Sequence, residues 1–416
     1  MNMTTIIPAG QNNKMRYIYQ LIAGRTISDI GSYLDMIALN LYVYLLTGSA
    51  VYMGLFMAVR LIGSFLAGFY SGMLADKFNR KKLMIISDVV RFGLLFSLVI
   101  TPQEYHFYML YFVTFGMGMF SSMFNVSMQS SIPMLVSPEN RVRANALLQS
   151  WQAMAMVVGM LSSGILINLL SYQSIFFIDS LTYLVSAVNL FSLPIKTNET
   201  RTQPDQKTSF FSEFSFIYRY LRVIPVLLSL MTIRLFDTFG SAAHNVGIPI
   251  YSSMIKPDNP SMIMGFIWGI WAIGNLVGSR FMSKHSKNAK ESFTEKAFGI
   301  STILMSFFFI LLFAFSSTYL LLICAFFAGI SDGISAICYN SRLQQVSDDK
   351  RGRVFGVSST LQTIGFAFGM LICSPLFEIM LPIWVVGILH GVPMIMALIF
   401  TIYFYRKWKV PKELAS

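Results

Sequence analysis

The sequence is poor in charged residues and in cysteine. Only 12% of its 416 residues are Asp, Glu, Lys or Arg, whereas a soluble domain has about 25%. The three cysteines, Cys324, Cys338 and Cys373, lie inside apolar runs without a C-x-x-C spacing, which argues against a disulfide framework or a metal site. The sequence also lacks a Walker A loop, paired catalytic carboxylates and a nucleophile elbow. We therefore expect neither an enzyme nor a cofactor.

Apolar residues are present in excess. They make up 55% of the chain, and the mean hydropathy is +0.61. Such a chain needs lipid as its solvent, and a helix of about 20 apolar residues crosses a bilayer. Runs of that length occupy residues 17–45, 51–74, 83–102, 106–130, 144–170, 173–194, 224–252, 261–283, 297–316, 318–340, 354–380 and 382–405. The pattern predicts an all-α membrane protein with about twelve transmembrane helices.

The net charge of +12 indicates the orientation of these helices rather than binding to nucleic acid. With a cytoplasmic N-terminus, about 26 of the 31 Lys and Arg residues fall on the cytoplasmic side, about four lie inside the helices, and only Lys256 falls outside. The polar N-terminus shows no cleavage site, so we expect the first helix to stay in the protein. We expect both termini in the cytoplasm of a multi-pass protein of the cell membrane, most simply a bacterial one.

One polar segment divides the chain nearly in half. Residues 196–211 read KTNETRTQPDQKTSFF, and residues 212–223 mix apolar and charged side chains in the manner of an amphipathic helix on a membrane surface. We expect an N-terminal six-helix bundle at 1–195, a cytoplasmic linker with the amphipathic helix at 196–223, and a C-terminal six-helix bundle at 224–416.

The two halves repeat each other at a nearly constant spacing of about 206 to 210 residues. The matched residues are Arg25 with Arg234, Gly31 with Gly240, Ser32 with Ser241, Tyr42 with Tyr251, Gly68 with Gly274, Gly72 with Gly278, Arg141 with Arg351, Arg143 with Arg353, Gln152 with Gln362 and Gly159 with Gly369. A steady offset across three helix pairs predicts two pseudo-symmetric halves of parallel topology. This architecture resembles that of the major facilitator superfamily, and the resemblance implies a substrate site near the midplane between two halves that rock around it.

The segment Gly72–Leu83, GMLADKFNRKKL, has a glycine, an aspartate four residues later and then a basic cluster. It resembles the loop motif between helices 2 and 3 of the major facilitator superfamily. The copy in the second half, Gly278–Lys287, keeps the glycine and the positive charge but lacks the aspartate. The resemblance implies a cytoplasmic gate in which an acid near one loop meets the N-terminal end of the eleventh helix. Its candidate residues are Gly72, Asp76, Arg80 and Arg353.

Four more segments resemble the branch of that superfamily that contains macrolide-efflux proteins and siderophore exporters. They are Leu46–Ala50 (LTGSA), Asp88–Arg91 (DVVR), Arg141–Ala146 (RVRANA) and Arg351–Gly356 (RGRVFG). The resemblance implies export. Two antiporter features are missing, because residues 114–125 contain no arginine and the fifth helix has no Gly-Pro motif. Proton antiport therefore needs separate evidence.

Charged residues inside the apolar runs cost about 2.5–3.5 kcal/mol each on insertion scales, and they are candidates for binding substrate or a coupling ion. The spacing of Arg25 with Asp29, and of Arg234 with Asp237, permits a local ion pair on one helix face, which is the structural alternative. Further candidates are Arg60, Asp179 and Asp332. His390 is interpreted as a hydrogen-bonded packing residue.

Asp35 has no cation three or four positions away, and its repeat partner is His244. We expect the two to face each other across the pseudo-twofold cavity and to bind a proton or a cationic substrate alternately. The alternative is an Asp35 that is hydrogen-bonded to a neighbouring helix. Tyr33, Trp151, Gln152 and Gln362 are candidates for the cavity lining, with simple packing as the alternative.

Together these observations predict a secondary active transporter that works by alternating access. We expect export of an amphipathic small molecule, such as a macrolide antibiotic, a siderophore or a secreted metabolite, by proton antiport, with antibiotic resistance as one consequence. A monomer is expected to suffice. Two alternatives remain, namely an ion-coupled uptake symporter for a small nutrient and a membrane receptor that transports nothing.

Overall fold

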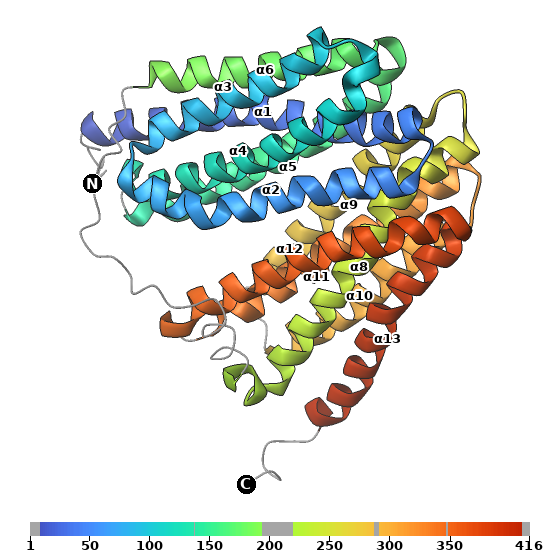
Figure 1. The fold of residues 1–416 in the computed structure, drawn as a ribbon. Coiled ribbons are helices and arrows are strands. Elements are labelled where there is room, and N and C mark those ends of the chain that lie inside the picture. The colour runs from blue at the N-terminus through green and yellow to red at the C-terminus, as the bar shows by residue number, and fades with distance from the viewer. Residues whose placement is uncertain (1–8, 137, 194–218, 287–290, 347, 410–416) are drawn as a thin grey trace, which may run out of the picture. The chain divides into compact units, whose positions relative to one another are not determined.

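The computed structural model describes residues 9–136, 138–193, 219–286, 291–346 and 348–409 (Figure 1). Within these ranges the chain is almost entirely helical, and no strand occurs. In the described part of the chain, twelve helices are long and apolar enough to cross a membrane. The prediction of an all-α protein with about twelve membrane-spanning helices is confirmed.

The first half contributes six long helices and one short turn of 3-10 helix, η1 (Gln103–Tyr105). The long helices are α1 (Ala9–Thr47), α2 (Ala50–Lys77), α3 (Arg80–Ile100), α4 (His106–Leu135), α5 (Pro138–Leu169) and α6 (Tyr172–Ser192). Local sequence sets two of their starts. The side-chain oxygens of Asn79 and Ser171 accept hydrogen bonds from backbone N–H groups in the first turns of α3 and α6.

The second half contributes α8 (Pro225–Ile255), α9 (Pro260–Ser286), α10 (Glu291–Leu312), α11 (Thr318–Gln344), α12 (Asp348–Ile379) and α13 (Pro382–Lys409). Three of these helices begin at a proline, which has no N–H group to leave unpaired in the first turn. The predicted amphipathic helix at 212–223 lies mostly outside the described residues, and residues 219–222 at its end are helical.

The chain packs as two compact units. One is Met1–Leu46 with Val59–Pro204, and the other is Thr47–Ala58 with Asp205–Ser416. The start of α2 thus belongs to the second unit. There the hydroxyl of Ser49 donates to Glu378 Oε1 on α12 over 2.7 Å, and the backbone N–H of Val51 donates to the same oxygen over 3.3 Å.

Glycine allows the second and fourth helices of each half to approach closely. A Cβ atom on Gly118 of α4 would lie 2.1 Å from the carbonyl oxygen of Arg60 on α2. In the second half, a Cβ atom on Gly329 of α11 would lie 2.1 Å from the carbonyl oxygen of Trp271 on α9. Small residues of this kind let membrane helices pack backbone to backbone, so the two halves share the same contact.

This packing corrects one detail of the sequence repeat. Gly274 lies against the carbonyl oxygen of Phe326, and Gly63 lies in the same way against that of Phe115. Gly68 has only Ser122 Oγ near it, 3.7 Å from the position of an added Cβ atom. Gly274 therefore matches Gly63, and the match with Gly68 is wrong.

Candidate functional site

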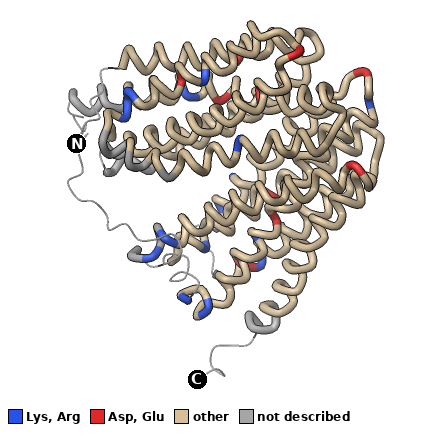
Figure 2. The backbone as a smooth tube through the Cα atoms, viewed as in Figure 1, with Lys and Arg blue, Asp and Glu red and all other residues tan. Residues whose placement is uncertain are grey.

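Charged side chains are sparse along the helices (Figure 2). Among the described residues, those that are buried are Arg25, Asp29, Asp35, Arg80, Asp88, Arg91, Asp179, Asp237 and Glu295. A charge at membrane depth is costly unless it is paired, so the partner of each residue indicates what it does. The two halves hold their charges in different ways.

In the first half, two arginines are paired with an acid on their own helix. Arg25 Nε lies 2.7 Å from Asp29 Oδ1 on α1, and Arg91 is paired with Asp88 on α3. Both guanidinium groups also lie 4.9 Å from the ring centroid of Phe124. The ion pair expected from the spacing of Arg25 and Asp29 is therefore present.

Asp35 of α1 is fully buried, and neither of its carboxyl oxygens has a hydrogen-bond partner within the described ranges. Asp179 of α6 is also fully buried. The two carboxyl groups are close enough to interact electrostatically, and both lie within the electrostatic reach of Arg60 on α2. Sequence reasoning noted Asp179 only as a charge inside a span and did not connect it with Asp35.

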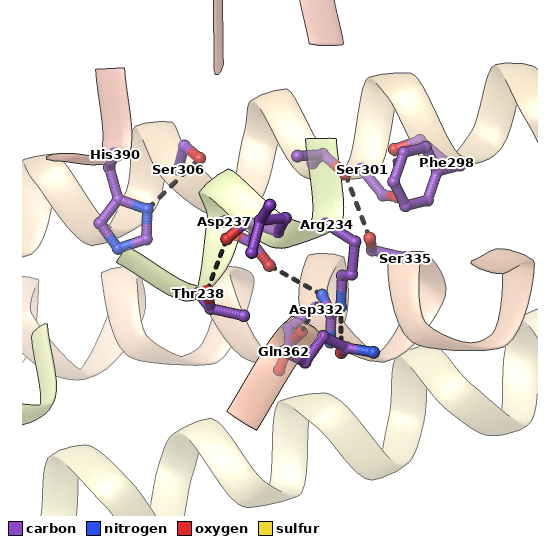
Figure 3. A network of polar contacts seen from close by, with 12 residues as sticks. Arg234, Asp237, Thr238, Phe298, Ser301, Ser306, Asp332, Ser335, Gln362 and His390 are labelled. Carbon is purple, nitrogen blue, oxygen red and sulfur yellow. Dashed lines mark hydrogen bonds and ion pairs between the residues drawn. The ribbon is translucent and has the colours of Figure 1, made fainter. Parts of the chain in front are cut away.

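In the second half, polar residues form a network around Arg234 (Figure 3). Arg234 Nη1 on α8 lies 2.8 Å from Asp237 Oδ2 and 3.8 Å from Asp332 Oδ1 on α11. Arg234 Nε donates to Gln362 Oε1 on α12 over 3.3 Å, and Asn275 Nδ2 on α9 donates to Asp332 Oδ2 over 3.1 Å. The local pair of Arg234 and Asp237 is present as expected, and the structure extends it to two further candidates, Asp332 and Gln362.

The two buried histidines of this half contact each other. His244 Nδ1 on α8 lies 3.0 Å from His390 Nε2 on α13. His390 Nδ1 lies 3.3 Å from the hydroxyl of Ser306 (Figure 3). The ring of His244 stacks on Phe309 with centroids 3.8 Å apart. His390 is thus a hydrogen-bonded residue of the interior, as expected. The facing of Asp35 and His244 stays a prediction.

The residues of the expected cytoplasmic gate are described only in part. Gly72 and Asp76 belong to α2, and the side chain of Asp76 lies outside the described part of the chain. Arg80, the first residue of α3, is buried and donates from Nη1 to the carbonyl oxygen of Ser130 on α4 over 2.6 Å. Arg353 is exposed near the start of α12. Arg80 therefore ties two helices together, and the gate itself stays a prediction.

The four candidates for the cavity lining have different surroundings. Tyr33 is half-buried, and its Cβ atom would lie 2.8 Å from a Cβ atom added to Gly159 on α5. Trp151 is 40% exposed, and Gln152 beside it is half-buried. Gln362 belongs to the Arg234 network. Tyr33 and Gln362 have evident structural contacts, and a role in lining a cavity stays a prediction for all four.

Comparison with known proteins identifies the family. The model of the Major Facilitator Superfamily matches residues 21–370. Macrolide efflux protein A of Streptococcus pyogenes is 22% identical over 377 residues, which cover 88% of this chain and 90% of that protein. An uncharacterised MFS-type transporter of Bacillus subtilis, YfiS, is 28% identical over 211 residues, which cover half of each chain.

Solved structures have the same fold at low sequence identity. A crystal structure of a mutant of the nucleoside transporter NupG superposes with a TM-score of 0.75 at 14% identity, covering 93% of this chain and all of that one. A bacterial homologue of the lysosomal transporter Spinster has a TM-score of 0.68 at 13% identity, covering 94% of this chain and 95% of that one. The family match extends over most of the twelve-helix fold, and so the chain belongs to the Major Facilitator Superfamily of membrane transporters.

Proposed function

We propose that this transporter exports an amphipathic small molecule of the macrolide type, driven by protons that move inward. The observation that supports the substrate class and the direction is the likeness to a macrolide efflux protein along 88% of this chain and 90% of that protein. The segments LTGSA, DVVR, RVRANA and RGRVFG, which resemble the efflux branch, lie within both halves and support the same proposal.

Proton coupling is supported by the contrast between Asp35 and the other two buried charges of α1, Arg25 and Asp29. Arg25 and Asp29 neutralise each other, whereas Asp35 is fully buried and its carboxyl oxygens have no hydrogen-bond partner in the described structure. A carboxyl group in such a place can carry a proton through the transport cycle as an uncharged acid. One proton moving down 100 mV supplies about 2.3 kcal/mol, enough for a roughly fiftyfold gradient of a neutral substrate.

The experiment is a measurement of accumulation in cells that lack their own macrolide exporters. Cells that produce the transporter should hold less labelled macrolide than cells with an empty vector, and an uncoupler should abolish the difference. Siderophores and cationic dyes, measured in parallel, define the substrate class. An uptake symporter would raise the internal concentration, and a receptor would leave it unchanged, so either result would contradict export.

A matched variant tests the coupling residue in the same cells. Asp35→Asn keeps the size and the hydrogen-bonding capacity of the side chain but cannot take up a proton. At equal amounts of protein in the membrane, this variant should lose export that is sensitive to the uncoupler. Full retention of that export would remove Asp35 from the mechanism.

A further inference from the structure

Helices α1 and α6 contact each other closely around Asp35. The hydroxyl groups of Ser32 and Tyr183 are 2.7 Å apart and connect the two helices. A Cβ atom on Gly31 would lie 1.9 Å from Asp179 Oδ1, so the carboxyl group of Asp179 occupies the space that this glycine leaves. Gly31 is one helical turn before Asp35. The absence of a side chain at Gly31 therefore brings the acid of α6 beside the acid of α1.

The surroundings of this carboxyl pair provide little compensation for two negative charges. Both acids are fully buried, and Asp35 and Asp179 Oδ2 have no hydrogen-bond partner among the described residues. The hydroxyl of Thr182 donates to Asp179 Oδ1 over 3.0 Å. Two like charges in a dry site repel each other strongly, so that only one carboxyl group of such a pair ionises readily.

The charged and titratable groups that face the pair come from three helices. Arg60 of α2 is half-buried and interacts electrostatically with both acids. Arg91 of α3 acts on Asp179, but it is already paired with Asp88. Tyr183 of α6 is a neutral phenol beside Ser32. One guanidinium group, that of Arg60, is thus left to balance the pair, which matches one carboxylate and one protonated acid.

The second half places the two equivalent positions within hydrogen-bonding distance of each other. Gly240, the repeat partner of Gly31, lies against His390, and a Cβ atom there would be 2.7 Å from His390 Nδ1. One turn later, His244 takes the place of Asp35 and is 3.0 Å from His390. The first and sixth helices of each half therefore present a pair of titratable side chains beside the same glycine, and in the second half the pair is directly hydrogen-bonded.

We propose that Asp35 and Asp179 share one exchangeable proton, and that Asp179 is the second carboxyl group of the coupling site. Its role in transport rests on the function proposed above. While the site is dry, the pair keeps the proton, because its loss would leave two carboxylates against one guanidinium group. When the cavity opens and water enters, the second carboxylate becomes hydrated and the proton leaves to that side. The pair then takes up a proton from the other side after the transporter has reoriented.

The sharing of the proton can be measured without any substrate. The infrared band of protonated carboxyl groups is recorded at neutral pH for the full chain in lipid nanodiscs. Asp35→Asn and Asp179→Asn should each remove one protonated carboxyl group, because the remaining acid can ionise beside Arg60. The double variant should remove no more than either single variant. Glu378→Gln, at an exposed acid on α12, is the matched control and should leave the band unchanged.

Other outcomes overturn the proposal. If the two acids were protonated independently, each single variant would lose a separate infrared band, and the double variant would lose both bands. Two ionised acids would give no change at all, and a band that disappears when sodium replaces choline in the buffer would indicate a metal cation instead.

Thr182→Val keeps both acids, and it should shift the band without removing it if Asp179 takes part in holding the proton.

Transport of labelled macrolide in proteoliposomes then separates this proposal from the proposed function. Asp179→Asn should keep the exchange of labelled for unlabelled macrolide at equal concentrations and lose export driven by a pH gradient. Unimpaired gradient-driven export in this variant would exclude Asp179 from coupling. If the unaltered protein transports no macrolide, the proposed function fails, while the infrared result still decides whether the proton is shared.

Discussion

The two halves of this transporter keep the same helix contacts and fill them with different polar groups. Gly118 and Gly329 bring the second and fourth helices of each half together in the same way, and Gly31 and Gly240 allow the first and sixth helices to do so. At the second contact, the first half has two carboxyl groups and the second half has two imidazoles. Duplicated backbone packing has thus been retained while the chemistry of the interior has diverged.

The charges differ in the number of helices that they connect. Arg25 and Arg91 each pair with an acid of their own helix, so each pair is neutral by itself. Arg234 contacts carboxyl groups on α8 and α11 and the amide of Gln362 on α12. The first half therefore neutralises these two arginines within single helices, whereas the second half uses Arg234 to connect helices.

The largest effect on stability is expected when a fully buried ion pair is broken. Arg91 is 2% exposed and its partner Asp88 is fully buried, so Arg91→Met leaves an unpaired acid in a dry site. We expect a loss of about 3–5 kcal/mol in the free energy of unfolding. Arg234→Met should cost less, because the Arg234 side chain is 19% exposed against 3% for Arg91, and water reaches its site at Asp332, which is also 19% exposed, although its closer partner Asp237 is buried. Unfolding in mixed detergent micelles measures both.

A double variant checks the reason for that difference. Arg91→Met combined with Asp88→Asn removes the stranded charge and should recover much of the lost stability. Equal losses for the two single arginine variants would show that the access of water to the arginine does not set the cost.

Coupling gives the next largest difference between the halves. Asp35→Asn should abolish a gradient of roughly fiftyfold per 100 mV, equivalent to about 2.3 kcal/mol, because no proton can be carried. His244→Asn, at the matched position, should keep gradient-driven export, since the hydrogen bonds of the buried histidine pair within the described structure run to each other and to Ser306. Steady-state accumulation in proteoliposomes with an imposed pH gradient decides this. Loss of coupling in both variants would contradict this prediction, because it would mean that both halves take part in proton transfer.

The shared helix contact predicts equal effects in the two halves. Gly118→Ala and Gly329→Ala each force a methyl group against a backbone carbonyl, and each should lower the free energy of unfolding by about 1–3 kcal/mol. Gly93→Ala and Gly387→Ala are matched controls, because nothing lies within 4 Å of an added Cβ atom there. These controls should be neutral or stabilising by up to about 1 kcal/mol. A clear difference between Gly118 and Gly329 would contradict equivalent packing.

The sequence predicts those features of the molecule that depend on residues close together in the chain. Apolar runs predicted the twelve helices, and spacings of three and four residues predicted the ion pairs of Arg25 and of Arg234. The proximity of Asp35 and Asp179 was missed, because it joins helices far apart in the chain and depends on how they pack. The available signal was the sequence repeat, because Asp179 and His390 are 211 positions apart and Asp35 and His244 are 209 positions apart.

The smallest expected difference concerns two matched tyrosines, Tyr42 and Tyr251. The hydroxyl of Tyr42 is 2.6 Å from His106 Nδ1, and His106 Nε2 lies 2.9 Å from the carbonyl oxygen of Thr101, to which it donates. Tyr42→Phe therefore leaves a buried ring nitrogen without its donor and should cost about 1–2 kcal/mol in the free energy of unfolding.

Tyr251 donates to the carbonyl oxygen of Phe315, a half-buried residue, over 2.9 Å. That oxygen can accept from water instead, so Tyr251→Phe should cost only about 0.6 kcal/mol. Unfolding of both variants in the same micelles measures the difference. A larger loss of stability for Tyr251→Phe would contradict the prediction, because it would mean that water cannot reach the carbonyl oxygen of Phe315.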